Sequence, residues 1–116
     1  METKREVLSY LLKLLESGKP VLIVGLKDKR IPDLHNFYPK KYYETIRHLG
    51  FGFFEGRTEH GTFSFDAGGA MQHHRFDDGT WIAWSHLRVE NREVLKDLGY
   101  DCGKVASALK EIIDKL

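Results

Sequence analysis

The spacing of the apolar residues changes twice along this chain. Near its start they recur every three or four positions, which is typical of one face of a helix. These residues are Val7, Leu8, Leu11, Leu12 and Leu15. Between residues 51 and 87 they alternate with small or polar residues, as Phe63 and Phe65 do, which is typical of strands. Helical spacing returns from residue 102, which predicts a single α+β domain over residues 1–116.

Helices are expected at both ends of the chain. Thr3 and Glu6 form a capping box ahead of the first apolar stripe, and Gly18 follows it, which predicts a helix over 4–16. A second amphipathic stripe predicts a helix over 102–116. Its buried side is expected to contain Val105, Leu109, Ile112, Ile113 and Leu116.

Two further helices are expected inside the chain. Pro39 suits the first turn of a helix and Gly50 suits the position just past its end, so the pattern predicts a helix over 39–49. Asn91 as an N-cap and Gly99 just past the end predict a short helix over 91–98.

The expected sheet is antiparallel and consists of two β-hairpins plus one short strand. The apolar run over 20–26 lacks alternation and predicts a strand buried on both faces. Residues 56–61 are expected to form the tip of the first hairpin, and Asp78-Gly79 predicts a two-residue turn in the second. This sheet is expected to pack against the N-terminal, central and C-terminal helices.

The composition excludes several classes of protein. The chain carries 18 Lys and Arg against 17 Asp and Glu, a net charge of +1, so no strong overall field attracts nucleic acid or a membrane surface. Its single cysteine, Cys102, excludes an internal disulfide and a thiolate zinc cluster, and it favours a cytoplasmic location. No apolar run approaches the ~20 residues of a membrane helix. We expect Cys102 to be an unreactive thiol, and no cofactor is expected.

The near-neutral total hides a positive segment. Residues 27–57 contain seven Lys and Arg against four Asp and Glu. Over residues 4–66 the expected order is helix, strand, helix and hairpin, with residues 31–36 as a small additional helix. This order is similar to that of winged helix-turn-helix domains. The resemblance implies a helix in the major groove of duplex DNA and a hairpin that acts as the wing.

Nucleic-acid binding is therefore the leading functional prediction. Lys and Arg would contact phosphates, and polar side chains would contact base edges. The predicted contact residues are Lys40, Lys41, Tyr43, Arg47 and Arg57. A small DNA-binding regulator of this kind is expected to be a homodimer, because symmetric dimers are the commonest soluble oligomers.

Two alternatives remain open. The two-residue turn would place Met71, His73, Arg75, Ile82, Trp84 and His86 on one face of the second hairpin. His73 and His86 could then exchange protons with a phosphodiester while Arg75 stabilises the developing charge, without a metal. With Asp66 these histidines could instead bind a metal, but the spacing matches no known metal motif, so no metal is predicted. The other alternative is a protein-interaction module that binds through a sheet edge. The sequence favours binding over catalysis.

Overall fold

The computed structural model describes residues 3–19, 21–29, 46–50, 53–66 and 72–116. These residues form three helices and an antiparallel six-stranded sheet, which confirms the expected α+β fold class. In chain order the elements are α1 (Lys4–Glu16), β1 (Val21–Lys27), β2 (Ile46–Gly50), β3 (Phe53–Thr58), β4 (Gly61–Asp66), β5 (Gln72–Arg75), β6 (Trp81–Val89), α3 (Arg92–Leu98) and α4 (Cys102–Asp114).

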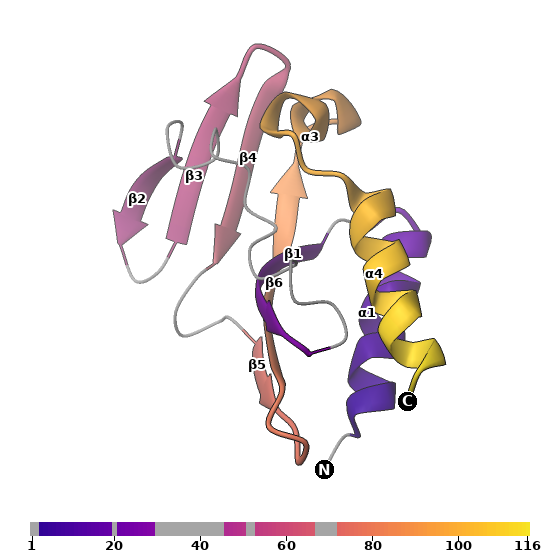
Figure 1. Ribbon diagram of the computed structural model, residues 1–116. Helices are drawn as coiled ribbons and strands as arrows, with labels where there is room; N and C mark the ends of the chain where they lie inside the picture. The colour runs from indigo at the N-terminus through magenta and orange to yellow at the C-terminus, as the bar shows by residue number, and fades with distance from the viewer. Residues whose placement is uncertain (1–2, 20, 30–45, 51–52, 67–71) are drawn as a thin grey trace.

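The long strand β6 pairs with three other strands and joins the two parts of the sheet (Figure 1). One of its edges pairs with β1, from Val21 opposite His86 to Lys27 opposite Trp81. The other edge pairs first with β5 and then with β4, and β3 and β2 continue the sheet outward from β4. Figure 1 shows α1 and α4 side by side as a helical layer, with the start of α1 and the end of α4 at the same end of that layer.

The core lies between this helical layer and the sheet. Helix α1 buries Val7, Leu8, Leu11 and Leu15, and α4 buries Val105, Ala108, Leu109 and Ile112. Each fully buried aliphatic side chain of this size stabilises the fold by about 1.5–3 kcal/mol relative to an exposed one. Ile113 is only half-buried and Leu116 is exposed, because α4 ends at Asp114 and the predicted stripe extends past its buried part.

The interior strands fit the sequence pattern. Val21, Leu22 and Ile23 are consecutive and all fully buried, which confirms a strand covered on both faces. Phe63 and Phe65 are only 1% and 5% exposed, so they belong to the core and offer no stacking surface for bases.

The prediction of a helix over 39–49 is wrong for residues 46–49, which the structure describes. Ile46–Gly50 is strand β2, which pairs with β3 and places Ile46 opposite Gly56. Residues 39–45 lie outside the described part of the chain. Ile46 and Leu49 are three positions apart, which is helical spacing, but two residues are a weak signal, and the hydrogen bonds offered by the edge of β3 favour the strand. The element order of a winged helix is therefore not seen in the described residues.

The tip of the first hairpin is shorter than expected. Gly56, Arg57 and Thr58 belong to β3, and the turn consists of Glu59 and His60. Arg57 therefore lies within a strand, opposite Thr62, instead of at a wing tip.

The turn of the second hairpin also differs from its prediction. The Phe76 amide donates to the Thr80 carbonyl at 2.9 Å, and the Gly79 amide donates to the Phe76 carbonyl at 3.0 Å. The loop thus has three residues, with Gly79 at a positive φ of 84° in the position that closes such loops. The added residue shifts the register by one, so His73 lies opposite Ala83 and Arg75 opposite Trp81.

Candidate functional site

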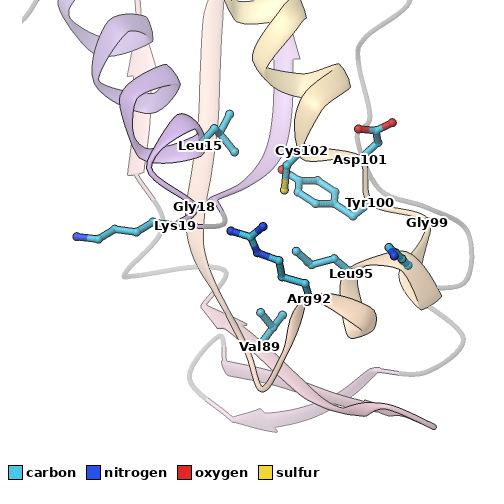
Figure 2. A pocket seen from close by; sticks show the side chains of 11 residues that line it. Leu15, Gly18, Lys19, Val89, Arg92, Leu95, Gly99, Tyr100, Asp101 and Cys102 are labelled. Atoms are coloured by element: carbon cyan, nitrogen blue, oxygen red, sulfur yellow. The ribbon is translucent and has the colours of Figure 1, made fainter.

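A pocket of about 580 Å³ lies where the end of α1, the end of β6, α3 and the start of α4 meet (Figure 2). Two stretches that are distant in the sequence contribute to it, residues 15–19 and residues 89–102. Its lining residues are Leu15, Gly18, Lys19, Val89, Arg92, Leu95, Lys96, Gly99, Tyr100, Asp101 and Cys102.

The inner wall of the pocket is apolar. Leu15, Val89 and Leu95 contribute aliphatic side chains, and Tyr100 contributes its ring. The Tyr100 hydroxyl is occupied elsewhere, because it donates a hydrogen bond to the backbone carbonyl of Val21. Burial raises the pKa of Tyr100, against the opposing effect of a backbone hydrogen bond at Ile23, so the phenol stays a neutral donor. Tyr100 therefore fixes the pocket wall to β1 instead of offering a reactive group.

The rim of the pocket is positively charged. Among the described lining residues there are three cations, Lys19, Arg92 and Lys96, and one carboxylate, Asp101. That carboxylate is already engaged, because Asp101 caps α4 by accepting a hydrogen bond from the Lys104 amide at 3.0 Å. The N-terminal end of α4 adds the partial positive charge of its helix dipole.

Arg92 is the cation that reaches furthest over the pocket. Figure 2 shows its side chain extending toward Gly18, whereas the ammonium group of Lys19 turns outward. A Cβ placed on Gly18 would lie 3.1 Å from the Arg92 Nη2 atom, so the absence of a side chain there leaves room for the guanidinium. Within the described parts of the chain, no carboxylate forms an ion pair with Arg92.

Cys102 borders the pocket but is poorly suited to nucleophilic attack. Burial and the neighbouring Asp101 carboxylate raise the pKa of its thiol, and Arg92 opposes them only in part. Because the thiolate is the reactive form, the raised pKa supports the expectation of an unreactive thiol. None of the histidines with described side chains lines this pocket.

The structure describes few of the predicted nucleic-acid contacts. Lys40, Lys41 and Tyr43 lie outside the described residues. The backbone of Arg47 lies in β2 opposite Glu55, and Arg57 is exposed in β3. Three of the five predicted contact residues therefore lie outside the described part of the protein, and the contact set stays a prediction.

Sequence reasoning overlooked Arg88, which is exposed on β6 opposite Ser64. Since Ser64 also lies opposite Glu55, the register aligns Arg88 with Glu55 across three strands. The same polar face includes Thr62, whose hydroxyl donates to Glu90 at 2.7 Å. Charges of both signs therefore alternate on this face.

The predicted catalytic set is divided between two faces of the second hairpin. His73 and Arg75 share a face with Trp81, and the rings of His73 and Trp81 stack with their centres 5.6 Å apart. His86 lies on the opposite face, which faces α1. The structure therefore does not bring His73, Arg75 and His86 together. Met71 lies outside the described residues, and Asp66 ends β4.

His74 is the histidine that shares a face with His86. These two residues line a groove of about 360 Å³ together with Val7, Tyr10, Gln72 and Trp84. Gln72 and Trp84 are paired across the two strands, and this pair lies between His74 and His86. A correct prediction of the three-residue turn would have placed His74, Trp84 and His86 on one face, but not the two residues of α1 that complete the groove.

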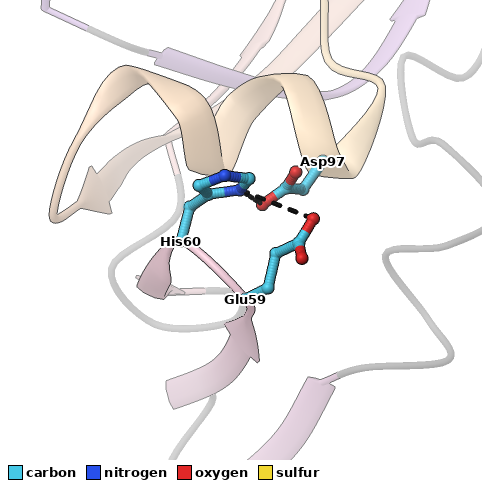
Figure 3. A group of neighbouring side chains, drawn as sticks. All are labelled: Glu59, His60 and Asp97. Atoms are coloured by element: carbon cyan, nitrogen blue, oxygen red, sulfur yellow. Dashed lines mark hydrogen bonds and ion pairs between the residues drawn. The ribbon is translucent and has the colours of Figure 1, made fainter.

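A third cluster joins the β3–β4 turn to α3 (Figure 3). The Nδ1 atom of His60 lies 2.8 Å from Asp97 Oδ2 and 3.8 Å from Glu59 Oε1. The hydrogen bond to Asp97 raises the pKa of His60, with smaller contributions from the charges of the neighbouring carboxylates. Turn and helix are thus joined by a short polar contact on the surface.

Comparison with known proteins gives no relative from which a function could be transferred. No protein-family model, curated protein sequence or solved structure matches this chain. Among the described helices, none combines the length and apolar character needed to cross a membrane.

Proposed function

We propose that this protein is a binding protein for a small organic anion with an apolar body, and that the pocket between α1, α3 and α4 is its site. The observation that carries the proposal is the position of Arg92. Its guanidinium stands at the edge of an apolar pocket, without an ionic partner in the described residues.

The ligand class follows from the two parts of the site. A volume of about 580 Å³ suits a small metabolite-sized molecule. Each CH2 group that moves from water to the wall of Leu15, Val89 and Leu95 contributes about 0.8 kcal/mol. A carboxylate or phosphate group can accept two parallel hydrogen bonds from a guanidinium, which fixes the orientation of the ligand.

The lining favours binding over turnover. Its one carboxylate caps α4, its phenol donates to Val21, and its thiol has a raised pKa. None of these groups is prepared to act as a general base or nucleophile.

A panel of aliphatic and aromatic carboxylates, each matched with its neutral amide, tests this proposal by calorimetry on the purified protein. The carboxylates are expected to bind, and the amides to bind more weakly. Arg92→Gln should weaken carboxylate binding by about tenfold to a hundredfold, because a charged hydrogen bond is lost. Leu95→Trp should block the pocket, whereas Arg88→Gln should leave binding unchanged. Equal affinity for acids and amides, or equal effects of the two arginine variants, would refute the proposal.

We propose nucleic-acid binding, with duplex DNA as the partner, as a second candidate function. It is supported by Arg57 and Arg88, which are both exposed on the polar strands of the β3–β4–β6 region. Phosphate contacts of this kind do not require a winged helix. The homodimer and the cytoplasmic location expected from the sequence belong to this proposal, and sedimentation of the protein with and without duplex tests the dimer.

Fluorescence anisotropy of a labelled duplex at low salt tests the second candidate. Saturable binding is expected, and its affinity should fall steeply as salt rises. Arg57→Gln and Arg88→Gln should each reduce the slope of log affinity against log salt by about 1. Lys13→Gln, a change on the exposed side of α1, serves as the control. Absence of saturable binding at low salt would exclude this function.

A further inference from the structure

We propose that Glu59, His60 and Asp97 form a zinc site that joins the β3–β4 turn to α3. The donor atoms of these three side chains all lie within 4.8 Å of one another (Figure 3). They come from two elements, so the arrangement depends on the fold and not on a local sequence motif. This site is separate from the pocket proposed above and adds a second ligand.

The distances are close to those of a coordination shell. Zinc binds imidazole nitrogen and carboxylate oxygen at about 2.0–2.2 Å in a tetrahedron, which places neighbouring donor atoms about 3.3 Å apart. The Nδ1 atom of His60 lies 2.8 Å from Asp97 and 3.8 Å from Glu59. Zinc binding requires the first of these distances to lengthen and the second to shorten, each by about half an ångström, and it requires the carboxylates of Glu59 and Asp97, whose donor atoms lie within 4.8 Å, to reach the same spacing. The side chain of Glu59 is 81% exposed, so it can make this adjustment without disturbing packed groups.

Two of the three donors are held in place before any ion binds. Asp97 lies on α3 with its side chain only 20% exposed. The backbone of His60 is fixed to the start of the same helix, because the Asn91 Nδ2 atom donates to the His60 carbonyl at 2.7 Å. Asn91 also caps α3 by accepting a hydrogen bond from the Glu93 amide. The turn and the helix therefore face each other at a constant separation.

The types of donor atom favour zinc over magnesium and calcium. One imidazole and two carboxylates suit zinc, whereas magnesium and calcium prefer a shell of oxygen atoms alone. Two carboxylates also balance the charge of a divalent ion. Lys96, the lysine of α3, pairs with Glu93 at 3.2 Å. Water would complete the shell, since the cluster is exposed.

Titration of the chelator-treated protein with Zn²⁺ alone tests this inference. Calorimetry should show one ion bound per chain, and Co²⁺ in its place should give the visible spectrum of a four-coordinate site. In NMR spectra the imidazole signals of His60 should shift first. Zinc should also raise the melting temperature, because it binds only the folded arrangement.

Matched variants identify the ligands. His60→Asn and Asp97→Asn should each weaken Zn²⁺ binding by about tenfold or more. Glu59→Gln should have a smaller effect in the same direction, and its exposure makes misfolding an inadequate explanation. Controls are His73→Asn on β5 and Glu93→Gln on α3, which should bind as the unaltered protein does. Unchanged affinity in His60→Asn, loss in His73→Asn, or no saturable binding of Zn²⁺ would each overturn the proposal.

Discussion

Lys4 shows how a single side chain can hold three segments together. Its ammonium group donates to Asp28 at 2.6 Å, to Asp78 at 2.8 Å and to the Thr80 hydroxyl at 2.6 Å. The three acceptors lie after β1 and around the β5–β6 turn, whereas Lys4 begins α1. All three ammonium hydrogens are therefore used, and the start of the helix is tied to the sheet.

Replacement of Lys4 by methionine should strongly destabilise the protein. Asp28 has no exposed side-chain surface, so it would lose a cationic partner that compensates the burial of its charge. We expect Lys4→Met to lower the free energy of unfolding by about 3 kcal/mol, measured by urea denaturation. Lys13→Met on the exposed side of the same helix should change it by less than about 0.5 kcal/mol. Similar effects of the two changes would contradict this view of Lys4.

The same cluster predicts sensitivity to acid. Partial burial by itself would raise the pKa of Asp78, but hydrogen bonds from Lys4 and Thr80 outweigh it and hold that pKa well below its ordinary value. A carboxyl group whose pKa is lower in the folded state stabilises the protein above its unfolded pKa of about 4. That stability is lost as the pH falls below about 4, toward the pKa of the folded state.

Urea midpoints measured at pH 5 and pH 3 test the contribution of Asp78. Asp78→Asn should be less stable than the unaltered protein at pH 5 and should lose less stability between the two pH values. Asp114→Asn, at an exposed carboxylate, should keep the full pH dependence. An unaltered pH dependence in Asp78→Asn would show that other carboxylates cause the loss.

At the scale of elements, local sequence signals predicted where helices begin and end, but they failed for strand β2, which depends on pairing with another strand. Thr3, Asn91 and Asp101 cap α1, α3 and α4, and such helix starts leave a local signal because a cap involves only its own first turn. Leu98-Gly99 ends a helix with Gly99 at a φ of 71°, whereas the similar Leu49-Gly50 ends a strand. The second outcome depends on pairing with β3, which no local pattern contains.

One close contact within the sheet gives a prediction at this scale. A Cβ on Gly56 of β3 would overlap the ring of Phe63, its partner on β4. Gly56→Ala should therefore destabilise the protein by about 2 kcal/mol through overpacking, measured by thermal unfolding. The cost should fall when Phe63→Leu is also present, because the smaller side chain makes room for the methyl group. Additive effects of the two changes would show that the ring does not cause the cost.

At the scale of the whole molecule, the fold class was predictable and the proposed pocket was not. Leu15, Arg92 and Cys102 are brought together only by the docking of α1, α3 and α4. Residues 58–101 contain four Lys and Arg against eight Asp and Glu. The net negative charge of this segment therefore did not indicate that two of its cations, Arg92 and Lys96, lie at the pocket rim. Average charge along a chain cannot show which side chains share a surface after folding.

The position of β6 also has a consequence for synthesis of the protein. This strand pairs with β1, β4 and β5, yet residues 28–80, nearly half of the chain, separate it from β1. A nascent chain that leaves the ribosome therefore exposes the apolar side chains of β1 until residue 89 has emerged. Long-range pairing of this kind slows folding and lengthens the exposure of strand edges. Conditions that stall translation before β6 is complete are therefore those under which the chain will most need a chaperone.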